Sequence, residues 1–167
     1  MDLEARRGWC VLTHVTSAKI ALKALLEAQL PIVLAQADAD ADDGVTTPLP
    51  YEINRSDKTA AGGYPAIELI ATGSIPQQDS FAQIMRHRVA VGVTVTGDDQ
   101  ETLTVWVERY LWAIRRIARD SLLAPTSLTG PIDSGVEEYS PLGSMDRSTE
   151  NPFVKAGYIE LFLTTVE

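Results

Sequence analysis

The sequence is poor in the residues that build disulfides and zinc sites. Its 167 residues include one cysteine, Cys10, and two histidines, His14 and His87. A single cysteine excludes an internal disulfide and is typical of a reducing compartment. Neither histidine has a spacing that favours zinc, and a thiol–base pair of Cys10 and His14 has little support on so uncertain a segment. We therefore expect no metal, no cofactor and no catalytic thiol.

Catalytic and nucleotide-binding motifs are also missing. The chain has no nucleophile elbow, no phosphate-binding loop and no dinucleotide-binding glycine fingerprint. The adjacent acids Glu137 and Glu138 would point to opposite faces of a strand, which makes a poor general acid/base pair. The aspartates from Asp38 onward begin like an EF-hand calcium loop, but the glycine comes one place late and Leu49 replaces the final glutamate. The sequence predicts a solvated acidic loop there, and a protein that is not an enzyme.

The chain also lacks an excess of positive charge. Its formal net charge is -9, whereas nucleic-acid binders usually present a basic surface. The first residues lack the apolar core of a signal peptide, and we expect no run long and apolar enough to cross a membrane. The hydrophobic fraction of 45% is ordinary for a folded protein. We expect a soluble chain, made in the cytoplasm, that folds as a single domain over residues 1–167.

The clearest structural pattern lies between Arg86 and Ser121. Valines alternate with small residues from Val89 to Val95, which predicts a strand over 86–96. The period then changes to that of a helix, with Asp98 as its N-cap and Glu101 completing a capping box. The helix should pack its apolar stripe on the valine face: Leu103, Trp106, Val107, Tyr110, Leu111, Ile114, Ile117 and Ala118.

The remaining elements are less regular. Residues 1–16 are ambiguous between a short strand and an arm. A helix is expected over 18–35, ending or kinking near Leu30 because of Pro31. Further strands are expected over 64–71, 132–139 and 153–166, and mobile loops near 37–50, 72–85 and 140–152. The predicted fold class is α+β, with a mainly antiparallel four-stranded sheet covered on one face by two helices.

The back of the central helix carries an unusual surface. A helix with one buried stripe should be polar on the opposite side, but Trp112 lies there among arginines. Tryptophan and arginine are favoured at protein–protein hot spots. Two other interpretations stay open: a tryptophan covered by arginine stems within the monomer, and a basic strip for nucleic acid. Arginines on one copy could also meet the acidic stretch 38–43 of a neighbour, head to tail. The candidate subunit-interface residues are Val105, Arg109, Trp112, Arg115, Arg116 and Arg119.

The order of these elements resembles a known family. An early helix is followed by strands joined through a loop bearing Pro76, Gln77 and Gln78. A strand then runs directly into GDDQETLTVWVERYLWAIRRI, and an apolar strand ends the chain. This pattern, over roughly residues 17–167, resembles the tail terminator (tail-completion or neck) proteins of long-tailed bacteriophages and gene-transfer particles. The resemblance rests on size and element order, and no catalytic residue comes with it.

The resemblance implies a structural virion protein of the tail or neck, assembled in the host cytoplasm. Such proteins form a ring, expected to be a homohexamer, that caps the tail tube, stops its polymerisation and joins it to the head. The implied partners are further copies of the chain, the tail tube protein and a connector or neck protein, with no membrane. DNA would pass through the channel without specific binding. The candidate partner-contact residues in the loops are Gln77, Gln78, Asp79, Met145, Asp146 and Arg147.

Other functions remain open at the level of sequence. A head-closure or adaptor protein of the neck would share much of the pattern. A small α+β ligand-binding domain, or an enzyme with an unrecognised site, would instead show a closed pocket with convergent polar groups.

Overall fold

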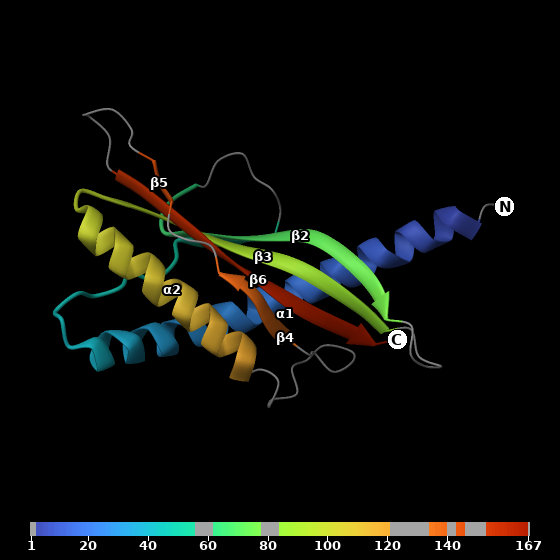
Figure 1. Ribbon diagram of the computed structural model, residues 1–167, viewed down its shortest axis with the longest axis horizontal. Coiled ribbons are helices and arrows are strands. Elements are labelled where there is room, and N and C mark those ends of the chain that lie inside the picture. Colours follow the sequence, from blue (N-terminus) through green and yellow to red (C-terminus); the bar gives the residue numbers. More distant parts are fainter. Residues whose placement is uncertain are drawn as a thin grey trace.

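A computed structural model shows a long helix, a second shorter helix and a mixed β-sheet (Figure 1). It describes residues 3–55, 62–77, 84–120, 134–139, 143–145 and 153–166. The α+β class predicted from the sequence is confirmed. The elements are α1 (Leu3–Ala41), β1 (Glu52–Asn54), β2 (Ala66–Gln77), β3 (Ile84–Gly97), α2 (Gln100–Asp120), β4 (Ser134–Tyr139), β5 (Gly143–Met145) and β6 (Phe153–Val166).

The sheet has β3 at its centre. The strand order is β1-β2-β3-β6-β4, and β5 pairs with the start of β6. Val91 of β3 lies between Leu69 of β2 and Ile159 of β6, and both neighbouring strands run antiparallel to it. The four predicted strands are all present as β2, β3, β4 and β6. The short strands β1 and β5 were not predicted, and β1 pairs parallel with β2, which makes the sheet mixed.

The strands β2 and β3 are longer than predicted. Most of the segment 72–85 was expected to be a loop, but β2 continues to Gln77 and β3 begins at Ile84. A register shift between Ala71 and Gly73 breaks the period of two, which hid the continuation of the strand in the sequence. β6 pairs with β3 along its whole length, so the extended part of β3 has strand partners on both sides.

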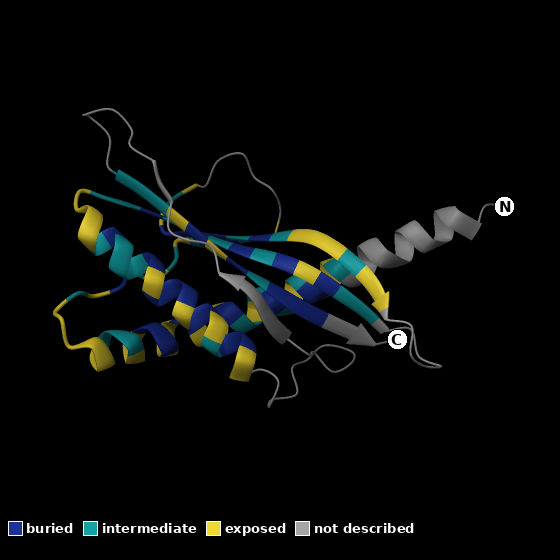
Figure 2. Cartoon of the chain, in the orientation of Figure 1, coloured by how far each residue is buried: buried dark blue, intermediate teal, exposed yellow. Residues whose placement is uncertain are grey.

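The core lies on the face of the sheet formed by the odd-numbered residues of β3. Val89, Val91, Val93 and Val95 are all fully buried, as the alternation predicts. They belong to one hydrophobic cluster with leucines of α1 and apolar residues of α2. Figure 2 shows the buried residues gathered along the inner sides of α2 and the central strands. Full burial of one such side chain contributes about 1.5–3 kcal/mol.

The helix α1 differs most from the prediction. It begins at Leu3, where a strand or an arm was expected, and it continues past Pro31 to Ala41. Proline removes one backbone hydrogen bond, which normally ends or kinks a helix. Here Leu30 and Leu34 are buried in the core on either side of the proline, and their packing outweighs the lost hydrogen bond. The predicted loop at 37–50 accordingly begins only at Asp42.

The same helix corrects the expectation about membranes. By length and composition the segment Val15–Ala41 is apolar enough to cross a membrane. Its apolar residues lie on two opposite sides of the helix. Leu22 and Leu26 on one side are buried in the core, while Ile20 and Ile32 on the other side are exposed. The buried side is the packing stripe of a core helix.

The N-cap of α2 lies one residue later than predicted. Asp99, not Asp98, accepts a hydrogen bond from the backbone N–H of Thr102 at 3.0 Å. The hydroxyl of Thr102 also donates to Asp99, at 2.5 Å. Since Thr102 occupies the third helical position, Glu101 does not complete a capping box.

Candidate functional site

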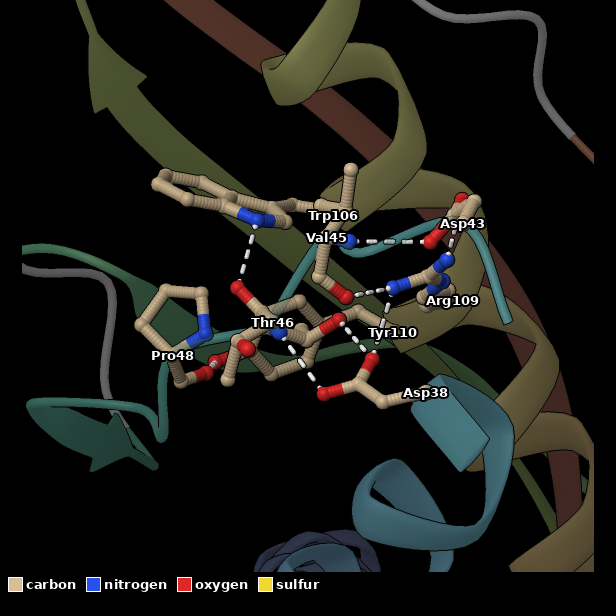
Figure 3. Close-up of polar contacts among 9 residues, drawn as sticks. Asp38, Asp43, Val45, Thr46, Pro48, Trp106, Arg109 and Tyr110 are labelled. Atoms are coloured by element: carbon tan, nitrogen blue, oxygen red, sulfur yellow. Dashed lines mark hydrogen bonds and ion pairs between the residues drawn. The ribbon is translucent and has the colours of Figure 1, made fainter. Parts of the chain in front are cut away.

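Arg109 joins α2 to the end of α1 and to the segment after it. It is buried, and its guanidinium donates from Nη1 to Asp38 Oδ1 at 2.7 Å and from Nη2 to Asp43 Oδ2 at 2.6 Å. Nη1 also donates to the carbonyl of Val45 at 2.6 Å. Figure 3 shows the guanidinium between these groups. One arginine therefore holds residues more than sixty positions away along the chain.

Local backbone geometry brings the two aspartates to Arg109. Asp38 lies in the last turn of α1, which ends at Ala41. Asp42 then has a φ of 46° and Gly44 a φ of 75°, so the chain turns sharply through the left-handed region. Aspartate and glycine tolerate this region better than most residues. The turn places Asp43 beside Asp38, on the side that faces α2.

Two aromatic side chains of α2 hold the rest of the 42–50 segment. Trp106 Nε1 donates to the carbonyl of Thr46 at 3.0 Å, and the hydroxyl of the fully buried Tyr110 donates to the carbonyl of Pro48 (Figure 3). Thr47 completes the set, because its backbone N–H and its hydroxyl both donate to Asp38, at 2.8 and 2.7 Å. The segment is therefore fixed along α2 by side chains, where a mobile loop was expected.

The network changes the acidity of its members. Burial disfavours the charge on Asp38, but hydrogen bonds from Thr47 and Arg109 outweigh it and lower the pKa of its carboxyl. The hydrogen bond from Arg109, followed by that from the Val45 N–H, lowers the pKa of Asp43. Burial raises the pKa of Tyr110. The carboxylates thus stay ionised and paired at neutral pH, and the tyrosine stays protonated.

These contacts change the interpretation of two predicted features. Arg109 was placed among the candidate interface residues, but its charge is used within its own chain. The acidic stretch 38–43 was expected as a solvated loop or as the partner of arginines on another copy. Asp38 and Asp43 instead pair with Arg109 of the same chain. Among the described residues no cluster of three or more His, Cys, Asp or Glu side chains could hold a metal ion.

The other predicted residues on the back of α2 are accessible. Trp112 is 43% exposed, and the Arg116 guanidinium carbon lies 5.2 Å from the centroid of its ring. Arg116 and Arg119 approach Asp120 at 3.6 and 3.8 Å. Arg115 is exposed and makes no ion pair with any residue that the structure describes. The structure therefore brings Trp112 and three arginines together on one surface, and Val105, which is half-buried, lies on the same side.

A shallow groove adjoins Trp112. It has a volume of about 380 Å³ and lies between the last turns of α1 and the middle of α2. Its floor is apolar, and two carboxylates at its edge, Asp40 and Glu108, form no ion pair within the described part of the chain. We call it the Trp112 groove; its lining residues are Ala37, Asp40, Ala41, Glu108, Arg109 and Trp112.

The predicted partner-contact residues are only partly visible. Gln77 ends β2 and Met145 ends β5, so both belong to strands. Gln78, Asp79, Asp146 and Arg147 lie outside the described residues. His87, expected to be an ordinary strand or surface residue, lies on β3 and is fully buried, with its Nδ1 2.8 Å from the hydroxyl of Ser74 on the neighbouring strand.

Sequence reasoning missed Ala37 and Ala41 as parts of this surface, whereas Asp40 belongs to the acidic stretch 38–43 that was considered as a partner for arginines of a neighbouring copy. A hydrophobic pattern broken by Pro31 hid the last turns of α1, and the groove exists only because the helix continues there. No protein-family model matches the chain, and no curated protein matches it.

Proposed function

We propose that the protein is a tail terminator of a long-tailed bacteriophage or gene-transfer particle. In this function copies of the chain form a ring, expected to be a hexamer, that caps the tail tube and ends its polymerisation. The ring joins the tube to the head or neck and leaves a channel for DNA. Its place is the virion, and its partners are the tube protein and a connector or neck protein.

The observation that carries the proposal is the exposed back of α2. Trp112 lies there between a group of arginines and two carboxylates that form no ion pair with any described residue, on a helix whose opposite side packs in the core. Exposed tryptophan and arginine on a rigid element favour contact with another protein. The element order that resembles tail terminators supports the same class of function.

Two further features support an assembly protein. We take both helices to cover a single face of the sheet, which the hydrophobic cluster shared by α1, α2 and the β3 valines supports. The net charge of -9 would repel the DNA phosphates and favour passage through a channel without binding. The ends of β2 and β5, at Gln77 and Met145, are the described parts of the proposed contacts to tube or neck proteins.

Electron microscopy with native mass spectrometry tests this function. The purified protein is measured over a range of concentrations, alone and together with polymerising tail-tube protein from its own virus. Rings of six copies with a central hole, and tubes that stop growing when the protein is added, are the expected results. A protein that stays monomeric in both samples and leaves tube growth unchanged would overturn the proposal. A closed ring of another number favours a head-closure or adaptor protein of the neck.

A further inference from the structure

We propose that the Trp112 groove binds the arginine-bearing end of α2 from a second copy of this chain. We call this end, which consists of Arg115, Arg116 and Arg119, the arginine end. This inference deepens the assembly function proposed above and rests on it, because it names the two surfaces that meet between neighbouring copies.

The groove is suited to a cationic side chain. Its two carboxylates, Asp40 and Glu108, lie beside the exposed ring of Trp112. Arg109 lines the same groove, but its charge is already paired with Asp38 and Asp43. Within the described residues neither carboxylate has an ion-pair partner, so the groove keeps two negative charges next to the Trp112 ring. Arg116 of the same chain already lies over the Trp112 ring, so an incoming guanidinium would gain an ion pair with these carboxylates.

The arginine end supplies the complementary charge. The last turns of α2 carry three arginines and one acidic residue, Asp120, so their net charge is positive. The side chain of Arg119 is 73% exposed. The stems of Arg115 and Arg119 could cover the apolar floor of the groove while their guanidinium groups reach its edge. Charge complementarity between the two surfaces thus identifies a second copy as the occupant.

Within one chain the arginine end contacts the groove only through Arg116, which lies over the Trp112 ring, and it leaves Glu108 without an ion pair. Glu108 and Arg115 are seven residues apart on the same side of α2, about 10 Å along the helix axis. Trp112 lies between them, and the structure has no ion pair between Glu108 and Arg115. The groove carboxylates and the Arg115 guanidinium of one molecule are therefore neighbours that form no ion pair with each other, and each can bind the opposite charge on another molecule.

Charge reversal tests the pairing. Glu108→Arg and Arg115→Glu should each weaken self-association, measured by sedimentation and native mass spectrometry, by roughly tenfold or more, because like charges would then face each other. The double variant Glu108→Arg/Arg115→Glu restores opposite charges and should recover wild-type association. An equal mixture of the two single variants should recover it as well. Higher salt should weaken the wild-type association.

A matched control separates the groove from overall charge. Asp98→Arg makes the same change of charge at an exposed position outside the groove, and it should leave association unchanged. Circular dichroism melting establishes that all variants are folded, as expected for exposed sites. Single variants that associate like the wild type, or a double variant that fails to recover, would overturn the pairing. A wild-type chain that stays monomeric to millimolar concentration would overturn it too.

Failure of the groove pairing can be told apart from failure of the tail-terminator function. Rings that cap tubes and persist in both single variants would overturn the groove pairing alone, and would leave the groove to another occupant such as a basic peptide. A wild-type chain that pairs through the groove, yet forms no ring and does not stop tube growth, would leave the pairing standing and remove the tail-terminator function.

Discussion

Arg109 on α2 and Asp38 at the end of α1 form an ion pair of 2.7 Å, although 71 residues separate them in the sequence. The pair is mostly shielded from solvent and is completed by Asp43 and by the carbonyl of Val45. It fixes the relative positions of the last turns of α1 and the middle of α2, which are the two walls of the Trp112 groove.

Replacement of Arg109 should therefore destabilise the fold. Arg109→Met keeps much of the side-chain volume but leaves Asp38 without its cationic partner. Removing one member of a largely buried pair leaves an uncompensated charge, and we expect a loss of roughly 2–4 kcal/mol in the free energy of unfolding. Urea denaturation measures the loss. Arg115→Met, on the exposed side of the same helix, is the control and should change stability by less than about 0.5 kcal/mol. Equal effects of the two substitutions would contradict a structural role for Arg109.

The same pair predicts a dependence of stability on pH. Burial opposes the charge on Asp38, but hydrogen bonds from Thr47 and Arg109 lower its pKa below the ordinary value of 3.8, and Arg109 lowers the pKa of Asp43. A carboxyl whose pKa is lower in the folded state than in the unfolded state stabilises the folded state, and this stabilisation is complete when the pH is above the unfolded-state pKa. The stabilisation is lost as the pH falls toward the native pKa.

Urea unfolding at a series of pH values tests this dependence. The wild type should lose stability from about pH 5 downward, and Arg109→Met should lose less over the same range, because its aspartates no longer have lowered pKa values from that partner. Asp98→Asn, which removes an exposed carboxyl outside the Arg109 network, serves as the control and should follow the wild type. If the free energy of unfolding of the wild type and of Arg109→Met changed in parallel with pH, the pairs of Arg109 with Asp38 and Asp43 would not contribute to the pH dependence.

Much of the fold could be predicted where the periodicity is clean. The valine alternation predicted β3 correctly and the apolar stripe predicted α2 correctly, because each pattern marks the one side of its element that is buried. The full length of α1 could not be predicted, since its apolar residues lie on two sides and Pro31 interrupts it. The strand β1 has three residues and pairs parallel with β2, so it leaves almost no periodic signal.

The candidate site could be predicted in part. Trp112 and Arg115 were identified because a helix should be polar opposite its buried stripe. The same reasoning placed Arg109 on that surface, where the structure buries it in a network with Asp38 and Asp43. A pairing between residues so far apart in the sequence has no local signal, and only the packing of α1 against α2 creates it.

The position of the N-cap of α2 gives a third prediction. Asp99→Ala removes the acceptor for the backbone N–H and the hydroxyl of Thr102, so it should lower the melting temperature. Asp98→Ala removes an equally exposed carboxylate next to it and should have a clearly smaller effect. Thermal unfolding followed by circular dichroism compares the two. A larger effect of Asp98→Ala would restore the assignment expected from the sequence.

The buried hydroxyl of Tyr110 gives a fourth prediction. It donates to the carbonyl of Pro48 and is the contact that holds the far end of the 42–50 segment on α2. Tyr110→Phe keeps the ring in the core but leaves that carbonyl without its donor, and should cost about 1 kcal/mol of stability.

Titration of the tyrosines provides an independent measurement on the same residue. Burial raises the pKa of Tyr110. Of the five tyrosines in the chain, Tyr51, Tyr64 and Tyr158 are exposed, in contrast to Tyr110. Ultraviolet absorbance of the native protein should therefore include a late step at high pH, when the fold opens and Tyr110 ionises. This late step should be missing in Tyr110→Phe. A late step of the same size in the variant and the wild type would contradict the buried hydroxyl contact of Tyr110.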